Sequence, residues 1–319
     1  MSSFFLGSYA TLNNSPWDSG LESEYYLGLK SIPLLQGLEI PFTGKLHPHD
    51  DAWFLKNISP DWNFVITCLP GIMDRLAHHP TIGLASDDES GRLEAIEFYR
   101  LAHEAVLKLN DHLGRSAVKA IEIHSGPTRS GNVTSSIESF KQSLETLSSW
   151  DWKACRVLVE HCDAYVHGQK SAKGFMSLED EIKVISEVNE STSRPIKMLI
   201  NWGRSVLEGR SVSTVLEHLH LVKKAELLEG LIFSGCTNEE NPWGIWKDNH
   251  VPPAPLAEKS LMTKESMEAC LEMAEVKDLK VLGLKVTNEP GMKNVESSVS
   301  LNLRALELLK GCLGHESDS

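Results

Sequence analysis

Val118-Lys119-Ala120-Ile121-Glu122-Ile123-His124 is predicted to be a buried strand, and Arg156-Val157-Leu158-Val159-Glu160-His161-Cys162 repeats its pattern after a helical-period run over 136–150. A strand, a helix and a second strand in this order predict two parallel strands joined by a right-handed crossover. The same alternation continues in both directions along the chain. It predicts strands at 4–10, 37–42, 64–69, 118–124, 156–162, 196–201, 230–234 and 280–286, and helices at 22–32, from 51, 92–110, 136–150, 178–188, 212–227, 264–274 and 295–310.

Eight strand–helix units close most simply into one α/β barrel, the (β/α)₈ or TIM fold. The alternative, an open doubly wound sheet, would usually bring a glycine-rich phosphate turn after a strand, and the sequence has none. No linker divides the chain, so we expect a single TIM-barrel domain over 1–319 with a disordered tail at 314–319. Long loops are expected after strands 3, 5 and 7, at 70–91, 163–177 and 235–262, on the face that carries barrel active sites.

The composition is that of a globular protein with an acidic balance. Hydrophobic residues make up 41% and charged residues 24% of the 319, so a packed core is expected. The 44 acidic and 31 basic residues give a net charge of −13, which argues against nucleic acids and anionic membrane surfaces as partners. No apolar run reaches the ~20 residues of a membrane helix. Six cysteines without a CxxC pair favour reduced thiols in the cytoplasm.

Charged and polar residues stand at or near the ends of six predicted strands. Because side chains alternate along a strand, Glu122 and His124 share the face opposite the isoleucines and should point into the barrel mouth. The other members of the set are Glu39, Glu160, Asn201, Ser234 and Lys285. Charges inside a buried parallel sheet are costly unless they are paired or functional, so their convergence indicates a site. The alternative is a structural ion-pair layer, such as Glu39–Lys285 or Glu122–Lys285.

Three segments carry a resemblance to a known family: Gly37-Leu38-Glu39-Ile40-Pro41-Phe42, Gly83-Leu84-Ala85-Ser86-Asp87-Asp88-Glu89 and Asn201-Trp202-Gly203-Arg204-Ser205. With the strand-end residues, the chain resembles the xylose isomerase-like TIM-barrel superfamily of sugar isomerases, sugar epimerases and endonuclease IV-like repair enzymes. Within it, these segments look like the family named domain of unknown function 4862. The resemblance implies a TIM barrel over nearly the whole chain and a divalent metal at the ends of strands five to eight.

The ligand pattern that the resemblance implies is only partly present. Glu160 matches the fifth-strand glutamate, and Asp248-Asn249-His250 resembles the Asp-x-His of the seventh-strand loop. Asn201-Trp202-Gly203-Arg204 stands where the endonucleases have Asp-x-x-His, strand seven lacks its histidine, and Lys285 replaces the glutamate of strand eight. Because an ammonium group repels a divalent cation, no metal or other cofactor is predicted. The fallback metal ligands are Glu160, His124, Asp248 and His250.

We expect a sugar or sugar-acid isomerase, epimerase or lyase that moves a proton next to a carbonyl. Glu160 or His124 would take the proton, with His250 as a further catalytic candidate, and Lys285 and Arg204 would supply the positive charge that a metal usually provides. The remaining side chains would bind substrate: Glu39, Glu122, Asn201, Ser234, Asp248 and the tryptophans Trp202, Trp243 and Trp246, which could stack on a sugar face. The tryptophans could instead pack the loops, and Arg204 could pair with Glu208 one helical turn away.

Two other functions stay open from the sequence. The barrel could bind a carbohydrate without chemistry, its metal site having decayed, although decay more often leaves small or apolar residues. An abasic-site nuclease is the weaker alternative, because the net charge is negative and the metal pattern is broken. We therefore expect a small-molecule carbohydrate as the partner. The sequence identifies neither the sugar nor the oligomeric state, and it is compatible with a homo-oligomer.

Overall fold

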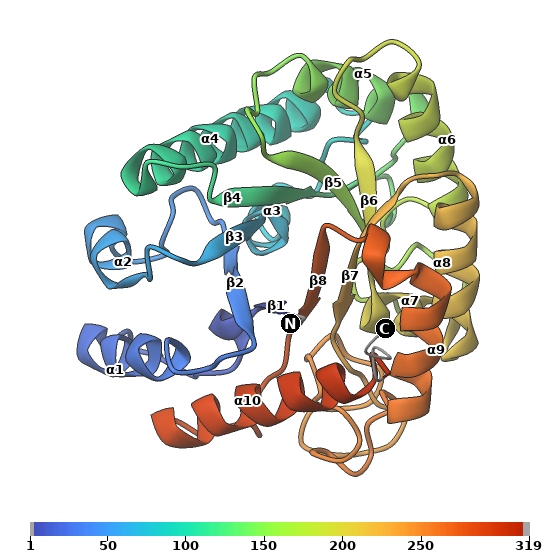
Figure 1. Ribbon diagram of the computed structural model, residues 1–319. Helices are drawn as coiled ribbons and strands as arrows, with labels where there is room; N and C mark the ends of the chain where they lie inside the picture. The colour runs from blue at the N-terminus through green and yellow to red at the C-terminus, as the bar shows by residue number, and fades with distance from the viewer. Residues whose placement is uncertain (1–2, 315–319) are drawn as a thin grey trace.

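The computed structural model describes residues 3–314, which form a closed barrel of eight parallel strands in chain order (Figure 1). The strands are β1 (Phe4–Leu6), β2 (Leu35–Pro41), β3 (Asn63–Thr67), β4 (Val118–Ile123), β5 (Arg156–His161), β6 (Lys197–Asn201), β7 (Leu228–Phe233) and β8 (Val281–Leu284). Pairing of β8 with β1 closes the sheet, so the prediction of a TIM barrel is confirmed. Residues 315–319 of the expected disordered tail lie outside the described residues.

Helices surround the barrel. They are α1 (Ser19–Leu29), α2 (Asp51–Asn57), α3 (Leu69–Leu76), α4 (Glu89–Leu113), α5 (Ile137–Ser148), α6 (Leu178–Asn189), α7 (Trp202–Gly209), α8 (Ser213–Lys224), α9 (Lys264–Ala274) and α10 (Val295–Gly311), with 3₁₀ turns η1 (Ser8–Ala10) and η2 (Val276–Asp278). Most begin after an Asp, Asn, Ser or Thr whose side chain accepts a hydrogen bond from the first turn. Asp88, for example, accepts from the Gly91 amide at 2.7 Å and starts α4. Such caps satisfy amides that have no partner within the helix.

Short elements differ from the sequence prediction. The first strand ends at Leu6, and 8–10 form the turn η1 instead of continuing it. The predicted loop 70–91 contains α3, whose first turn holds Pro70 where a missing N–H costs nothing. A further helix, α7, follows β6 directly because the Asn201 side chain accepts from the Arg204 amide at 3.4 Å. Helices of about two turns are too short to show a clear apolar period, which is why the sequence did not predict them.

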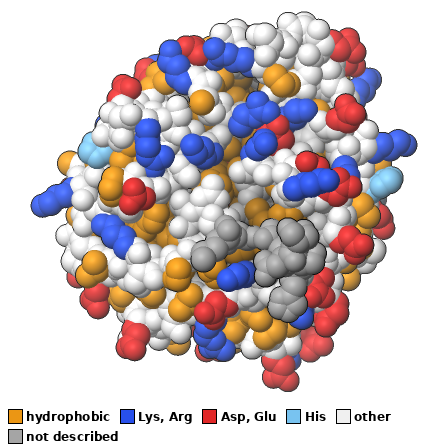
Figure 2. Space-filling view, in the orientation of Figure 1, with side chains coloured by type: hydrophobic (Ala, Val, Ile, Leu, Met, Phe, Trp, Pro, Cys, Tyr) orange, Lys and Arg blue, Asp and Glu red, His pale blue; other side chains and the backbone are white. Residues whose placement is uncertain are grey.

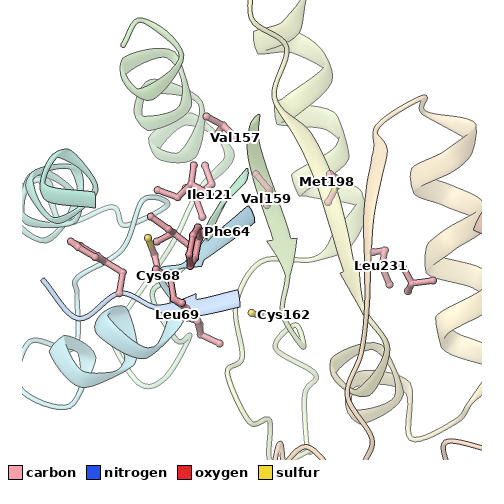
Figure 3. Packing of buried hydrophobic residues seen from close by; sticks show 14 of the residues in the cluster. Phe64, Cys68, Leu69, Ile121, Val157, Val159, Cys162, Met198 and Leu231 are labelled. Carbon is pink, nitrogen blue, oxygen red and sulfur yellow. The ribbon is translucent and has the colours of Figure 1, made fainter. Parts of the chain in front are cut away.

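Two apolar layers make up the core, one inside the barrel and one between the barrel and the helices. The inner layer takes one residue from each of seven strands: Phe5, Val65, Ala120, Leu158, Leu199, Ile232 and Val281. Strand residues of the opposite parity, such as Ile121, Val157 and Val159, pack in the outer layer (Figure 3). Fully burying one aliphatic side chain stabilises the fold by about 1.5–3 kcal/mol. Residues that follow the inner layer on the same face of each strand therefore lie at the C-terminal mouth of the barrel.

Three further observations concern the predictions made from the composition. No helix within residues 3–314 is long and apolar enough to cross a membrane. Both acidic and basic side chains are exposed on the face that Figure 2 shows. The six cysteines are all free thiols and all buried.

Candidate functional site

The C-terminal mouth of the barrel collects the polar residues that lie beyond the inner apolar layer. Glu39, Glu122, His124, Glu160, Asn201, Ser234 and Lys285 all occupy this position, and none is more than 1% exposed. The structure thus brings together the strand-end residues that the sequence selected. Several of these side chains form hydrogen bonds or ion pairs with one another, and these contacts limit which of them a ligand could reach.

Glu160 is the centre of one buried network. Its Oε2 accepts from His124 Nε2 at 2.8 Å, its Oε1 accepts from Asn201 Nδ2 at 3.1 Å, and Arg204 forms an ion pair with the same Oε1. Burial alone would raise the pKa of the Glu160 carboxyl, but the Arg204 guanidinium and the His124 hydrogen bond hold it well below its usual range. Glu160 is therefore ionised, and both of its oxygens are engaged.

Lys285 forms the second buried pair, with Glu39. Its ammonium pairs with Glu39 Oε1 and lies 5.3 Å from the centre of the Tyr9 ring. Burial opposes the charge, but Glu39 and other nearby acidic groups keep the pKa of Lys285 well above its usual value. The Tyr9 hydroxyl donates to the same Glu39 oxygen at 3.4 Å. The ion-pair alternative for Glu39 and Lys285 is thus present, and Tyr9 covers it.

Glu122 differs from the other acids of the mouth, because it has no hydrogen-bond partner among residues 3–314. Neither of its carboxyl oxygens makes a hydrogen bond within the described residues, and the side chain is fully buried. Burial, followed by the charges of Glu39 and Glu160, raises the pKa of Glu122 well above its usual range. Among the acids of the mouth, Glu122 is therefore one that burial and like charges drive toward its protonated form.

Asp248 and His250 form the outer edge of the site. Asp248 Oδ2 lies 3.4 Å from Arg204 Nε and 3.1 Å from Lys173 Nζ. His250 Nδ1 lies 2.7 Å from Ser234 Oγ and 3.5 Å from Asp248 Oδ1. Burial outweighs the attraction of Asp248 and lowers the pKa of His250 to about 3, so its imidazole is neutral. The His250 backbone is left-handed (φ 52°), a conformation that is uncommon for residues other than glycine.

Two cavities open at the mouth, and Tyr9, Ala10 and Asn13 line both of them. The first, of about 360 Å³, is also lined by Trp17, His47, His49 and Glu39. The second, of about 520 Å³, is also lined by Trp243, Asp248, Asn249 and His250. Both volumes are in the range of small-molecule sites, roughly 300–1,000 Å³. The buried charged residues line neither cavity, and none is more than 2% exposed: Glu122, His124, Glu160, Arg204 and Lys285.

Several lining residues were not selected from the sequence. Trp17 stacks on His49 with ring centres 5.0 Å apart, and its Nε1 donates to Glu22 at 2.5 Å. Tyr9 was placed in a strand, although it belongs to the turn η1. The aromatic residues in the loops after the first two strands could have indicated these lining residues, because all loops that follow strands lie at the same face of the barrel.

Three sequence expectations need correction. Trp202 cannot stack on a sugar, because it is fully buried in the outer core at the start of α7. Trp246 packs under Arg210, whose guanidinium carbon lies 4.8 Å from its ring, and it lines neither cavity at the mouth. The alternative pairing of Arg204 with Glu208 is also wrong, since Arg204 turns inward to Glu160. Trp243 does line the second cavity.

Two groups of side chains within residues 3–314 could hold a metal ion, each with ligand atoms within 4.8 Å of one another. The first, His124–Glu160–Cys162, lies at the mouth, but Arg204 shares its space: the guanidinium pairs with Glu160 and lies 3.4 Å from Cys162 Sγ. A guanidinium stays protonated and repels a cation. This group therefore does not fit a divalent metal. The second group, His161–Glu208–His218, lies on the other side of β5.

Comparison with known proteins gives one family and one fold. The model of the family named domain of unknown function 4862 matches residues 5–301. An uncharacterised protein of Salmonella typhimurium is 32% identical over 290 residues, which are 91% of this chain and 90% of that protein.

Among solved structures, the IolI protein with a bound zinc atom matches with a TM-score of 0.60 at 12% identity, covering 98% of this chain and all of that one. D-psicose 3-epimerase, solved in the presence of D-fructose, matches with a TM-score of 0.58 at 11% identity over the same shares. At these identities the likeness shows the fold alone, a TIM barrel. Because the family model spans most of its length, the chain belongs to the family of the domain of unknown function 4862.

Proposed function

We propose that this chain is an isomerase or epimerase of a small sugar or sugar acid and moves a proton next to a carbonyl without a metal at the barrel mouth. The observation that carries the proposal is the pair of cavities that meet at Tyr9. Glu39 lines one and His250 lines the other, with the Lys285 ammonium beneath. The substrate class is supported by a similar barrel, D-psicose 3-epimerase, solved with D-fructose. A lyase would begin with the same proton removal.

Glu39 is the carboxylate that we assign as the base. Burial raises its pKa, while the attraction of Lys285 opposes the rise, and the net shift is upward. A general base works best when its pKa approaches the working pH, so this shift favours Glu39 over Glu160, whose pKa is depressed. In an isomerase, Glu39 would take the proton from the carbon next to the carbonyl and return it to the former carbonyl carbon, while the proton of the substrate hydroxyl passes to the carbonyl oxygen. In an epimerase, the proton would return to the same carbon on its opposite face.

Neutral donors and a buried cation would stabilise the enediolate. Burial raises the pKa of the Tyr9 hydroxyl above its usual value, so it stays protonated and can donate to a substrate oxygen. His250 is neutral and can donate in the same way, a use of a lowered histidine pKa with precedent in enzyme sites. At an effective dielectric of ~20, two unit charges ~5 Å apart attract by about 3 kcal/mol. Lys285 could therefore contribute roughly 100-fold in rate.

Glu160, Arg204 and His124 would position these groups instead of touching the substrate. Arg204 connects Glu160 to Asp248, and Asp248 in turn contacts His250. The chain of contacts fixes the imidazole that lines the cavity. In this account the positive charge that a divalent metal would otherwise supply comes from Lys285.

Deuterium exchange tests the proposal. A panel of aldoses, ketoses and sugar acids is incubated with the protein in D₂O, and ¹H NMR follows the loss of the C–H signal next to the carbonyl. We expect exchange on at least one member, lowered about 10²–10⁴-fold in Glu39→Gln. His220→Gln, an exposed histidine on α8, is the matched control and should leave the rate unchanged. Absence of exchange across the whole panel contradicts the proposal.

A second candidate function is carbohydrate binding without chemistry. The observation in its favour is that the buried charges are already paired, Arg204 with Glu160 and Lys285 with Glu39. Stacking of Trp17 and His49 at the first cavity offers an aromatic surface to a sugar. This function predicts saturable binding of a sugar by calorimetry with no deuterium exchange, whereas the enzyme predicts both.

A further inference from the structure

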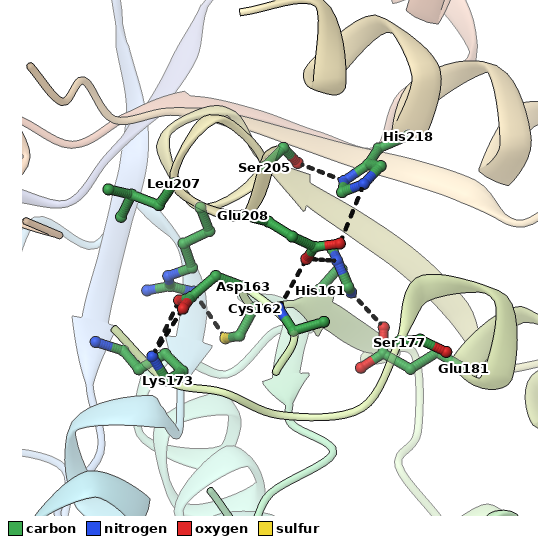
Figure 4. Close-up of polar contacts among 12 residues, drawn as sticks. His161, Cys162, Asp163, Lys173, Ser177, Glu181, Ser205, Leu207, Glu208 and His218 are labelled. Carbon is green, nitrogen blue, oxygen red and sulfur yellow. Dashed lines mark hydrogen bonds and ion pairs between the residues drawn. The ribbon is translucent and has the colours of Figure 1, made fainter. Parts of the chain in front are cut away.

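His161, Glu208 and His218 form a buried cluster outside the barrel mouth. His161 follows Glu160 on β5, so its side chain points to the opposite face, toward the helices. Glu208 comes from the end of α7 and His218 from α8. Figure 4 shows His161 between Glu181 and Glu208, with His218 approaching Glu208 from its own helix. The site described above uses none of these side chains.

Each of the three side chains brings one possible ligand atom within 4.8 Å of the others. His161 Nε2 lies 3.0 Å from Glu208 Oε2, and His218 Nε2 lies 3.6 Å from Glu208 Oε1. Bonds of about 2.0–2.1 Å in a tetrahedral zinc site separate neighbouring ligand atoms by about 3.4 Å. The 3.6 Å contact is too long for a hydrogen bond, so the His218 Nε2 is directed at the carboxylate without bonding to it.

The second ring nitrogen of each histidine has a polar partner, as is usual for histidines that bind a metal. Nδ1 of His161 contacts Glu181 Oε2 at 2.7 Å, and Nδ1 of His218 contacts Ser205 Oγ at 2.9 Å. Each imidazole therefore has its Nδ1 occupied and its Nε2 turned to Glu208. Hydrogen bonds of this kind fix ring orientation and tautomer in metal sites. With two neutral imidazoles, the charges of Glu181 and Glu208 balance those of a dication.

We propose that His161, Glu208 and His218 bind one Zn²⁺ ion, which links β5 to α7 and α8, with a water molecule as the fourth ligand. The Glu208 side chain is 16% exposed, and it gives the ion a route from solvent, while the His161 side chain is fully buried. The competing occupant is a proton: without a metal, His161 would be an imidazolium shared by Glu181 and Glu208. The two cases differ in whether a metal binds with saturation at this place.

Cobalt titration decides between them. The protein is treated with a chelator, dialysed and titrated with Co²⁺, and the visible absorption of four-coordinate cobalt is followed. We expect one equivalent in the wild type and an affinity lowered more than 100-fold in His218→Gln. Glu181→Gln, which removes an outer hydrogen-bond partner, should weaken binding about 10–100-fold. His220→Gln, two residues further on the exposed face of α8, should bind like the wild type.

The result does not depend on the proposed function, because β5 separates this cluster from the mouth. His250→Gln should retain cobalt binding, and loss of binding in His250→Gln instead of His218→Gln would overturn the assignment. Absence of saturable binding in the wild type would do the same. If His218→Gln fails to fold, wild-type crystals soaked in Co²⁺ give the answer. The anomalous peak must lie among His161, Glu208 and His218, and a peak only elsewhere rejects the site.

Discussion

Replacing Arg204 by methionine removes the guanidinium that neutralises Glu160 in the barrel mouth. The two side chains are 2% and 1% exposed, so water cannot take the place of the lost partner. The same guanidinium contacts Asp248 Oδ2 and Cys162 Sγ, each at 3.4 Å. Methionine preserves much of the packing volume, and the substitution therefore isolates the electrostatic loss.

The expected effect is large because one charge stays behind. Removing one partner of a buried ion pair typically costs about 3–5 kcal/mol. At about 1.4 kcal/mol for each factor of ten, the ratio of folded to unfolded protein falls by roughly two to four powers of ten. Adding Glu160→Gln removes the stranded carboxylate, so the double variant should regain part of the loss. The two substitutions are thus predicted to be strongly non-additive.

Urea unfolding at pH 7, followed by circular dichroism, measures all four members of this cycle. Arg100→Met is the matched control, because Arg100 pairs with Glu97 and Glu104 on the exposed surface of α4. Its unfolding midpoint should stay close to that of the wild type. The reasoning is refuted if Arg204→Met changes the free energy of unfolding by less than about 1 kcal/mol, or if the double variant shows simple additivity.

Burial and charge predict three further outcomes. Because the pKa of Glu122 is raised on folding, wild-type stability falls as the pH rises from the pKa of the unfolded state to that of the folded state. Glu122→Gln should therefore have a higher urea midpoint than the wild type at pH 9 but not at pH 4. Equal midpoints at pH 9 contradict this. Trp202→Ala should cost about 3–5 kcal/mol in unfolding free energy, and the half-buried Trp246→Ala less; the reverse order would show that Trp202 is not in the core. Abasic-site DNA should be neither bound nor cleaved in a gel assay, because the net charge is −13; cleavage that disappears in Glu160→Gln would show the opposite.

The alternation of residues along the strands was enough to predict most of the fold and the buried polar residues at the mouth. From the sequence alone, alternation within Ala120–His124 predicts that Glu122 and His124 lie on the inner face, because a pleated strand has only two faces. The same rule applied to Glu160 and Lys285. The sequence could also predict that a cation would occupy the mouth, since Lys285 stands at the end of its strand.

Contacts between distant loops could not be predicted in this way. Lys173 pairs with Asp248, and Tyr9 covers Glu39 and Lys285, yet no periodicity connects these positions. Loop conformation depends on tertiary packing and on local exceptions such as the left-handed backbone of His250. The short helix α7 could not be predicted for a related reason. Its eight residues make too few turns to show an apolar period, and its first residue is set by the cap at Asn201.

The central claim is proton transfer at the mouth without a metal there. The most direct test is the rate of deuterium incorporation into the best substrate of the panel, measured in D₂O by ¹H NMR with excess chelator and again with added Mg²⁺, Mn²⁺ or Zn²⁺. The account predicts the same rate in all four conditions and its loss in Glu39→Gln. Exchange that stops in chelator and returns with one of these ions in both the wild type and His218→Gln would contradict it, because the metal would then act at the mouth.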